Sequence, residues 1–119
     1  MAYVSRGSRW LDWMPWTPWR VVGIVDSADE IPEVIQRKGA VLVGTENYVK
    51  WVAFDCPCGS GHRILLNVDK RTRPFWRLSG SKRLTLRPSI DYRDGSRRCH
   101  YFIVDGRVHW ARSGEEYDE

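Results

Sequence analysis

The stretch Phe54-Asp55-Cys56-Pro57-Cys58-Gly59-Ser60-Gly61-His62 decides the fold, because it joins two apolar segments through a turn rich in metal-binding side chains. It contains two of the chain's three cysteines and one of its three histidines. The third cysteine follows far downstream, in the adjacent pair Cys99-His100. Thiolate and imidazole groups paired on tight turns are the usual ligands of structural zinc. The sequence therefore predicts a Zn²⁺ site that clasps two distant parts of the chain.

Five residues compete for the four positions of a tetrahedral zinc site: Cys56, Cys58, His62, Cys99 and His100. The single residue between Cys56 and Cys58 is shorter than the usual spacer of about two to four residues. Adjacent strand residues point to opposite faces, so Cys99 and His100 both bind only if the chain turns or bulges there. In the alternative set His62 is the fourth ligand and His100 is packed or hydrogen-bonded. The residues leave the choice between the two histidines open.

The composition predicts one small globular domain. The chain has 119 residues, of which 42 % are hydrophobic and 29 % charged, as in ordinary globular proteins. No apolar run approaches the ~20 residues of a membrane-spanning helix, and no apolar signal segment opens the chain. We therefore expect a cytoplasmic protein, in which cysteines are more often metal ligands than disulfide partners.

The apolar segments predict a mainly β fold of antiparallel hairpins with one short helix and a zinc-ribbon-like clasp. Strands are predicted at residues 20–25, 40–44, 48–54, 63–68, 75–78, 83–86, 101–104 and 107–110. Asp105-Gly106, between the last two, is typical of a tight hairpin. Residues 91–98 are predicted to form a polar loop. Pro32, followed by apolar residues at helical spacing and then Gly39, predicts the helix.

The chain is expected to have three parts: a Trp/Pro-rich N-terminal arm at 1–19, a zinc-binding β domain at 20–112 and an acidic tail at 113–119. In the arm, Trp10, Trp13, Trp16 and Trp19 recur every third residue, a period that fits a polyproline II segment. These indoles either pack on their own domain, since exposed Trp is costly, or form a surface that binds a protein partner.

The segment from 63 to 98 is strongly basic, with eleven Lys/Arg against three Asp. Basic side chains interleaved with aromatic ones suit single-stranded nucleic acid. Nucleic-acid binding is therefore an alternative function, for which the candidate residues are Arg63, Lys70, Arg71, Arg73, Trp76, Arg77, Lys82, Arg83 and Arg87. The simpler interpretation is a solvated sheet face on which long basic side chains cover apolar surface.

The sequence contains no catalytic constellation that we recognise. A catalytic zinc keeps one open position beside a carboxylate base, and the chain has no His-Glu-x-x-His motif. A nucleophilic pair of Cys58 or Cys99 with a histidine has no further support. We therefore predict a protein that is not an enzyme.

Several motifs resemble a family of small bacterial and phage proteins whose domain has no known function. They comprise the Cys56-Pro57-Cys58-Gly59 knuckle and its surroundings, at residues 38–44, 50–59, 62–64, 66–67, 88–91, 99–103, 106–108 and Trp110. The resemblance covers roughly residues 31–110. Members often carry another Cys where Ser60 stands, and some have a wider spacing between the downstream Cys and His.

The resemblance implies a zinc-binding domain without established catalysis. Some members are encoded beside bacterial ubiquitin-like conjugation genes, which include activating and conjugating enzymes and a deubiquitinase-like peptidase. Together with the knuckle and the Trp-rich arm, it predicts a structural-zinc protein-interaction module that serves such a system. A ubiquitin-like or conjugating protein is the expected partner, and the oligomeric state stays open.

Overall fold

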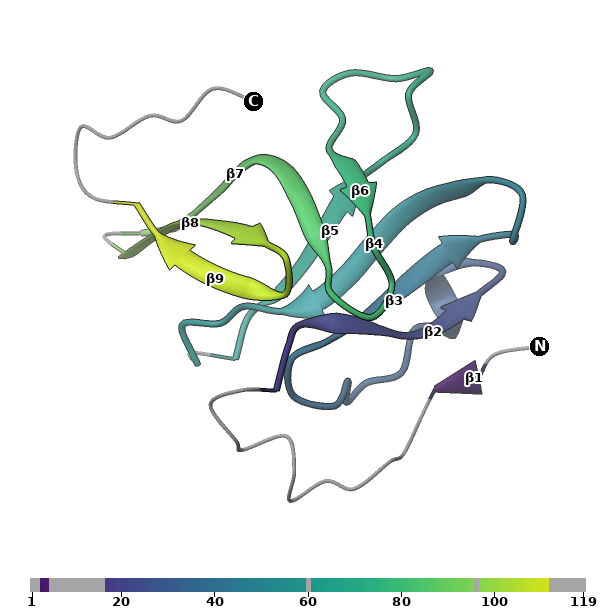
Figure 1. Ribbon diagram of the computed structural model, residues 1–119, viewed down its shortest axis with the longest axis horizontal. Coiled ribbons are helices and arrows are strands. Elements are labelled where there is room, and N and C mark those ends of the chain that lie inside the picture. Colours follow the sequence, from purple (N-terminus) through teal and green to yellow (C-terminus); the bar gives the residue numbers. More distant parts are fainter. Residues whose placement is uncertain (1–2, 5–16, 60, 96, 112–119) are drawn as a thin grey trace.

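A computed structural model describes residues 3–4, 17–59, 61–95 and 97–111 of the protein, which form two β-sheets (Figure 1). The first sheet has the order β1-β2-β3-β4-β5, with β1 (Tyr3–Val4), β2 (Arg20–Val25), β3 (Gly39–Gly44), β4 (Val49–Asp55) and β5 (Arg63–Asn67). The second has the order β6-β7-β8-β9, with β6 (Arg77–Ser79), β7 (Thr85–Asp94), β8 (Arg97–Val104) and β9 (Arg107–Trp110). The prediction of a mainly β fold is confirmed.

Helical structure in the described residues is a single 3-10 turn, η2 (Ala28–Glu30). No helix in this part of the chain is long and apolar enough to cross a membrane.

The connection from β2 to β3 differs from the prediction, because these two strands pair in parallel and residues 26–38 must cross from one end of the sheet to the other. The helix predicted from Pro32 does not form in this crossover. The carbonyl groups of Pro32 and Glu33 instead accept hydrogen bonds from the Arg63 guanidinium, at 3.2 and 2.7 Å. Ile35 is buried beneath the crossover, whereas Val34 is 76 % exposed.

The main core lies between the two sheets, because side chains from both enter one apolar cluster. Its buried members are Trp19, Ala40, Val52, Phe54, Cys56, Ile64, Leu66, Leu84, Leu86, Ile90, Cys99, Tyr101 and Ile103. A smaller cluster, which includes Ile35, Val41 and Ala53, lies on the other face of the first sheet under the crossover. The first sheet is therefore covered on both faces.

The polar loop predicted at residues 91–98 is wrong, since most of it is paired strand. β7 runs to Asp94, β8 begins at Arg97, and Asp91 lies directly opposite His100. Nearer the core the register shifts by two residues, because three residues of β7, 87–89, face one residue of β8. A shift of two keeps the alternation of faces, so Leu86 and Ile90 both still enter the core. Such bulges re-aim side chains and are frequent beside active sites.

Trp19 joins the start of the first sheet to the second one. Its backbone N–H donates to the carbonyl of Gly106 at 2.8 Å, and its carbonyl accepts from the N–H of Leu84 at 2.9 Å. The indole is buried and meets the ring of Phe54 edge-on, with the centroids 5.7 Å apart. Trp19 therefore belongs to the core, while Trp10, Trp13 and Trp16 lie outside the described residues.

Candidate functional site

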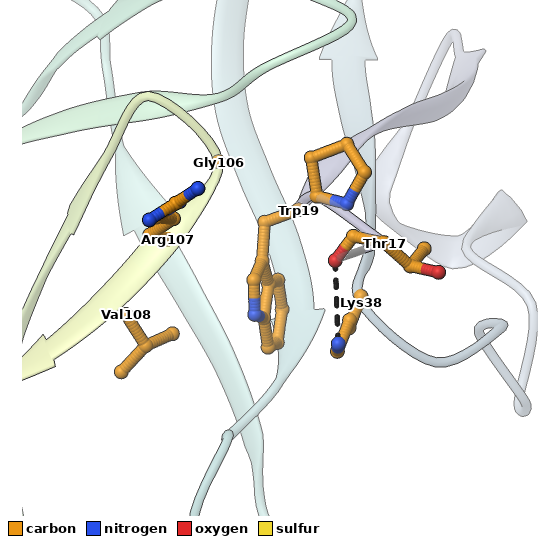
Figure 2. Close-up of a pocket in the computed structure, with 7 residues that line it drawn as sticks. Thr17, Trp19, Lys38, Gly106, Arg107 and Val108 are labelled. Atoms are coloured by element: carbon orange, nitrogen blue, oxygen red, sulfur yellow. Dashed lines mark hydrogen bonds between the residues drawn. The ribbon is translucent and has the colours of Figure 1, made fainter. Parts of the chain in front are cut away.

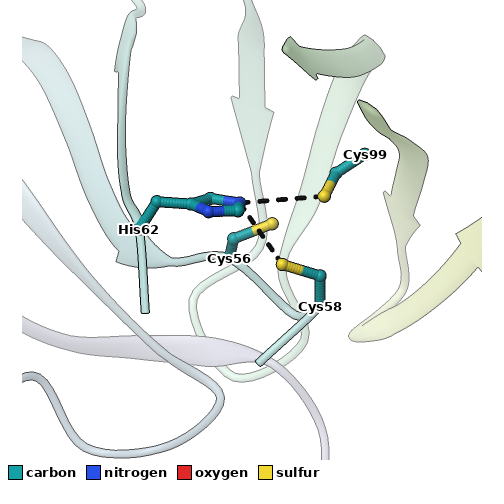
Figure 3. A group of neighbouring side chains, drawn as sticks. All are labelled: Cys56, Cys58, His62 and Cys99. Atoms are coloured by element: carbon teal, nitrogen blue, oxygen red, sulfur yellow. Dashed lines mark hydrogen bonds between the residues drawn. The ribbon is translucent and has the colours of Figure 1, made fainter. Parts of the chain in front are cut away.

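Four predicted ligands come together between the sheets, where Figure 3 shows three sulfur atoms converging on one imidazole. Cys56 follows β4, Cys58 lies in the turn, His62 precedes β5 and Cys99 lies in β8. Their ligand atoms are all within 4.8 Å of one another, a group able to hold a metal ion. His62 Nε2 is 3.3 Å from the Cys58 sulfur and 3.7 Å from the Cys99 sulfur.

The turn is folded so that its side chains point inward. The N–H of Cys56 donates to the carbonyl of His62 at 3.0 Å, which closes the loop at its base. The N–H of Gly59 donates to the carbonyl of Cys56 at 3.2 Å, and Gly59 has a φ of 79°. That left-handed conformation favours glycine. The His62 ring stacks on Tyr92, with the centroids 4.3 Å apart, and this fixes the plane of the imidazole.

The surroundings of the four residues favour a bound cation, because burial disfavours thiolates that have no positive charge beside them. Burial raises the pKa of the Cys99 thiol to about 12, and the neighbouring Cys58 and Cys56 thiols act in the same direction. Burial is also the main cause that raises the pKa of Cys56. The buried Tyr101 hydroxyl has no hydrogen-bond partner among the described residues. Burial is the main cause that raises the pKa of the Tyr101 hydroxyl, and the nearby Cys56 is the second cause. The hydroxyl therefore stays protonated, and a metal-bound Cys56 thiolate would accept its hydrogen bond.

His100 is not part of this group. It follows Cys99 on β8, and the two side chains point to opposite faces of the second sheet, Cys99 into the core and His100 outward. His100 Nε2 instead lies 3.0 Å from the hydroxyl oxygen of Ser89 on β7. A serine hydroxyl within hydrogen-bond distance of an imidazole is the arrangement that activates a serine nucleophile.

Ser89 is positioned by the bulge of β7. The alternation between Leu86 and Ile90 directs it to the outer face, toward His100. The indole N–H of Trp76 donates to the backbone carbonyl of Ser89 at 3.2 Å, while the body of Trp76 packs against the main core. The backbone that carries the hydroxyl is thus tied to the core on its inner side.

A carboxylate completes the neighbourhood of the Ser89–His100 pair. Asp91 faces His100 directly across the β7–β8 ladder, and directly opposed side chains lie on the same face. Arg98 donates to both carboxylate oxygens of Asp91, at 2.9 and 2.8 Å. These hydrogen bonds are the main cause that lowers the pKa of Asp91, and the charge of His100 contributes less. Asp91 therefore stays negative beside the imidazole.

The residues predicted for nucleic-acid binding are dispersed over both sheets. Arg63 donates to Asp55 at 2.7 Å, Arg71 to Asp69 at 3.0 Å, and Arg73 lies over the ring of Phe75. Exposed positions are those of Lys70, Arg77, Lys82 and Arg83, whereas Arg87 and Trp76 are half-buried. Nucleic-acid binding stays a prediction.

A pocket beside the Trp19 junction contains none of these groups. It is lined by Thr17, Trp19, Lys38, Arg107 and their neighbours, and Lys38 donates to the carbonyl of Thr17 at 3.2 Å (Figure 2). Its lining has basic side chains but no candidate nucleophile, so it adds no catalytic group to the site.

Sequence reasoning did not single out Ser89 or Asp91 and treated His100 only as a candidate metal ligand. A signal was present in Asp94-Gly95, which is a hairpin dipeptide as strong as Asp105-Gly106. In the hairpin register that follows, Asp94 pairs with Arg97 and Asp91 lies opposite His100. The bulge that brings Ser89 to the same imidazole has no comparable signature in the sequence.

A family model, BubE, described as a bacterial ubiquitination-like system serine protease, matches residues 27–111. No match to the chain was found among curated proteins or among solved structures. The predicted connection to bacterial ubiquitin-like conjugation is confirmed at the level of the family. The prediction that the chain is not an enzyme is wrong, because the matching family is one of serine proteases. The sequence offered no local catalytic motif, and a Ser–His pair assembled across two strands leaves none.

Proposed function

The chain belongs to the BubE family of bacterial ubiquitination-like system serine proteases, and we propose on this premise that it is a serine peptidase with Ser89 as nucleophile and His100 as general base. The observation that carries the proposal is the 3.0 Å contact between Ser89 Oγ and His100 Nε2. The substrate would be a protein of such a system, cleaved at a peptide or isopeptide bond beside a ubiquitin-like protein.

The geometry supports acyl transfer through the serine. Ser89 Oγ attacks the carbonyl carbon of the scissile amide while its proton passes to His100 Nε2. The C–N bond breaks as His100 returns that proton to the leaving nitrogen, and Ser89 holds the acyl group as an ester. Water then attacks the ester, gives a proton to His100 and releases the carboxylic acid, and Ser89 regains its proton.

Asp91 supports this cycle electrostatically. When His100 takes the proton it becomes an imidazolium, and a negative charge directly across the strands stabilises it. For Nε2 to accept from Ser89, the neutral ring must carry its proton on Nδ1, and a nearby carboxylate favours that tautomer. Arg98 keeps Asp91 ionised and fixed in place.

We also propose that the Cys56, Cys58, His62 and Cys99 group holds a structural Zn²⁺. Three thiolates and one imidazole fill a tetrahedral zinc site and leave no open coordination position. Zinc bound there would hold the β4–β5 turn of one sheet against β8 of the other, and the chemistry would be left to Ser89 and His100.

The test compares Ser89→Ala and His100→Ala with the wild-type chain and with Ser79→Ala, which removes an exposed hydroxyl from β6 of the same sheet. The substrate is a ubiquitin-like protein joined through its C-terminus to a reporter protein. Ser89→Ala and His100→Ala should each lower kcat/KM by at least about 1,000-fold, and Ser79→Ala should leave it unchanged.

A second readout does not depend on knowing the substrate. A fluorescent fluorophosphonate, which modifies activated serines, should label the wild-type chain and Ser79→Ala but neither Ser89→Ala nor His100→Ala. Full labelling and full hydrolysis by Ser89→Ala would eliminate Ser89 as the nucleophile.

A further inference from the structure

The second half of β7 has a neighbouring strand on one side only. β6 pairs with β7 at residues 85–87 and goes no further, whereas β8 accompanies β7 as far as Asp94 (Figure 1). In the described part of the chain, the backbone of β7 beyond Ser89 is therefore an open edge of the second sheet. Such an edge presents a row of N–H and C=O groups with which another extended chain can pair.

The hydrogen-bond pattern of the β7–β8 hairpin shows which groups face this edge. In an antiparallel ladder, opposed residues alternate between pairs that exchange hydrogen bonds and pairs that do not. The two-residue turn makes Asp94 and Arg97 a bonded pair, so Tyr92 also bonds to β8. The backbone N–H and C=O groups of Asp91 and Arg93 therefore point away from β8, toward the open edge.

The partner of Asp91 confirms this alternation. His100 lies opposite Asp91, and its carbonyl accepts from the N–H of Ala111 at 2.9 Å, on the side of β8 that faces away from β7. Among the residues that the structure describes, no hydrogen bond is found to the backbone of Asp91 or Arg93. Two donors and two acceptors are thus offered along the edge.

Trp76 closes one end of the open edge, next to Ser89. The carbonyl of Ser89 accepts from the indole N–H of Trp76 at 3.2 Å, so it offers nothing to a further strand. A chain that pairs with Arg93 and Asp91 then has to leave the plane of the sheet beside Ser89. Because Trp76 packs against the main core on the inner side, that chain leaves toward the outer face, where Ser89 Oγ meets His100.

The direction of the bound chain follows from β6. A segment that continues the line of β6 runs antiparallel to β7, as β6 does, and antiparallel pairs outnumber parallel ones about two- to three-fold. β7 runs from Ser89 toward Asp94, so the bound segment runs from Asp94 toward Ser89. Its C-terminal end reaches the hydroxyl, and that end carries the carbonyl of the scissile bond.

We propose that the edge of β7 at residues 91–93 binds the part of the protein substrate that precedes the scissile bond, by adding it to the sheet as a strand. This rests on the proposed function, because the edge is assigned to the substrate by its position beside Ser89. In that function the bound segment is the C-terminal end of the ubiquitin-like protein. Backbone groups of alternate substrate residues make the bonds, so the segment has to be extended.

The first test asks whether binding depends on alternate backbone N–H groups of the ligand. The last six residues of the ubiquitin-like protein, labelled with fluorescein, are titrated against the Ser89→Ala chain, with one N–H at a time replaced by N-methyl. Methylation at alternate positions should weaken binding by roughly ten-fold, with little effect at the positions between them. An equal loss at every position, or a loss at none, would overturn strand addition.

The second test removes a donor from the protein. Arg93→Pro deletes the N–H that faces the edge and leaves the ladder with β8 intact, a position at which strands tolerate proline. Arg93→Ala removes the same side chain and keeps the N–H, so Arg93→Pro should bind the peptide roughly ten-fold more weakly than Arg93→Ala. Equal affinities would contradict the proposal.

Val108→Pro is the matched control for the proline. By the same alternation, counted from the Val104–Arg107 pair, the N–H of Val108 faces the opposite edge of this sheet, on β9. This substitution should leave peptide affinity unchanged, and a ten-fold loss would show that the effect is not confined to the edge beside Ser89. Melting curves report whether each variant folds. If Arg93→Pro does not, the N-methyl series decides alone, since it leaves the protein unaltered.

Binding and turnover distinguish the edge from the proposed function. An alternating N-methyl pattern in a chain that hydrolyses nothing would support the edge and defeat the peptidase alone. Hydrolysis of the aminocoumarin amide of the same peptide that depends on Ser89, without that pattern and without an effect of Arg93→Pro, would defeat the edge alone. Sedimentation tests a second copy of the chain as the occupant. A dimer that Arg93→Pro dissociates would assign the edge to self-association and overturn the proposal.

Discussion

In the proposed mechanism, the side chain of Ser89 owes its reactivity to one neighbour rather than to a motif. An isolated serine hydroxyl is a weak nucleophile at neutral pH, and His100, at hydrogen-bond distance, would supply the base. Asp91 adds a fixed negative charge opposite the ring. All three residues lie on β7 or β8, and the register of these strands together with the bulge of β7 brings them together.

Asp69 holds the loop after β5 through several bonds to one carboxylate. Its Oδ1 accepts from the Tyr48 hydroxyl and from the backbone N–H of Arg71, and the Arg71 side chain donates to both carboxylate oxygens. Bonds from Arg71, and then from Tyr48, lower the pKa of Asp69 strongly. The loop is therefore stabilised by the ionised form of Asp69.

Replacement of this carboxylate by an amide should destabilise the chain in a pH-dependent way. A carboxyl whose folded pKa is lowered contributes stability above its ordinary pKa of about 4, and that stability is lost as the pH falls toward the folded value. Asp69→Asn should thus melt below the wild-type chain at pH 7, and the difference should shrink below about pH 4. Equal pH profiles for wild type and Asp69→Asn would contradict the role of Asp69.

The turn between β8 and β9 holds the Trp19 junction through the backbone hydrogen bonds of Gly106. Gly106 has a φ of 78°, and its N–H donates to Leu84 at 2.8 Å. A Cβ added at Gly106 would lie 2.6 Å from the Cβ of Pro18, closer than carbon atoms approach in folded proteins. The turn therefore needs glycine for its backbone conformation and also for the close approach of the chain before β2.

Gly106→Ala should lower the free energy of unfolding by about 2–4 kcal/mol, from strain at positive φ together with the collision with Pro18. Gly95→Ala is the matched control, because Gly95 has a φ of 62° but open space around it. It should cost only about 1–2 kcal/mol. Denaturant unfolding measures both, and equal losses would show that Pro18 can move aside.

Strand positions were predictable where local chemistry determines them. Asp105-Gly106 identified the last hairpin, and the Cys56-to-His62 turn identified the junction of β4 and β5. The β7–β8 hairpin was missed because charged residues surround Asp94-Gly95 and resemble a solvated loop. Within the crossover, a helix was predicted from Pro32 up to Gly39. The spacing of apolar residues does not reveal that the Arg63 guanidinium binds two backbone carbonyl groups there.

The candidate site was only partly predictable for a different reason. Cysteine and histidine are rare enough that their clustering predicts a metal group directly. The partner of His100 depends on the register of β7 against β8 and on a two-residue bulge, which are tertiary properties. One serine among the nine in the chain carries no comparable signal.

At the scale of the whole molecule, the metal group links the two sheets. Three of its members lie in the β4–β5 turn of the first sheet, and the fourth lies on β8 of the second sheet. A bound ion would therefore join the two sheets at one edge of the main core. Because His100 follows Cys99 on the same strand, an ion that fixes Cys99 would also fix the strand that carries the proposed base.

Removal of the metal should therefore weaken both the fold and the active pair. We expect one zinc per chain, and chelation should lower the melting temperature by at least about 10 °C, since structural zinc contributes several kcal/mol of folding free energy. Fluorophosphonate labelling of Ser89 should fall in parallel, and both should return when zinc is added back.

Cys99→Ala provides the control for this experiment. It should melt at the temperature of the chelated wild-type chain and respond no further to the chelator. A metal-free wild-type chain with an unchanged melting transition would rule out the structural ion.

The eleven-residue separation of Ser89 and His100 also has a consequence during synthesis. The chain leaves the ribosome with its serine first, and the base follows only after the turn that reverses β7 into β8. A nascent or prematurely terminated chain that ends before His100 therefore has a harmless serine. If Ser89 is the nucleophile as proposed, activity therefore arises only after the β7–β8 hairpin has been synthesised, and a product that stops before His100 has no activated serine.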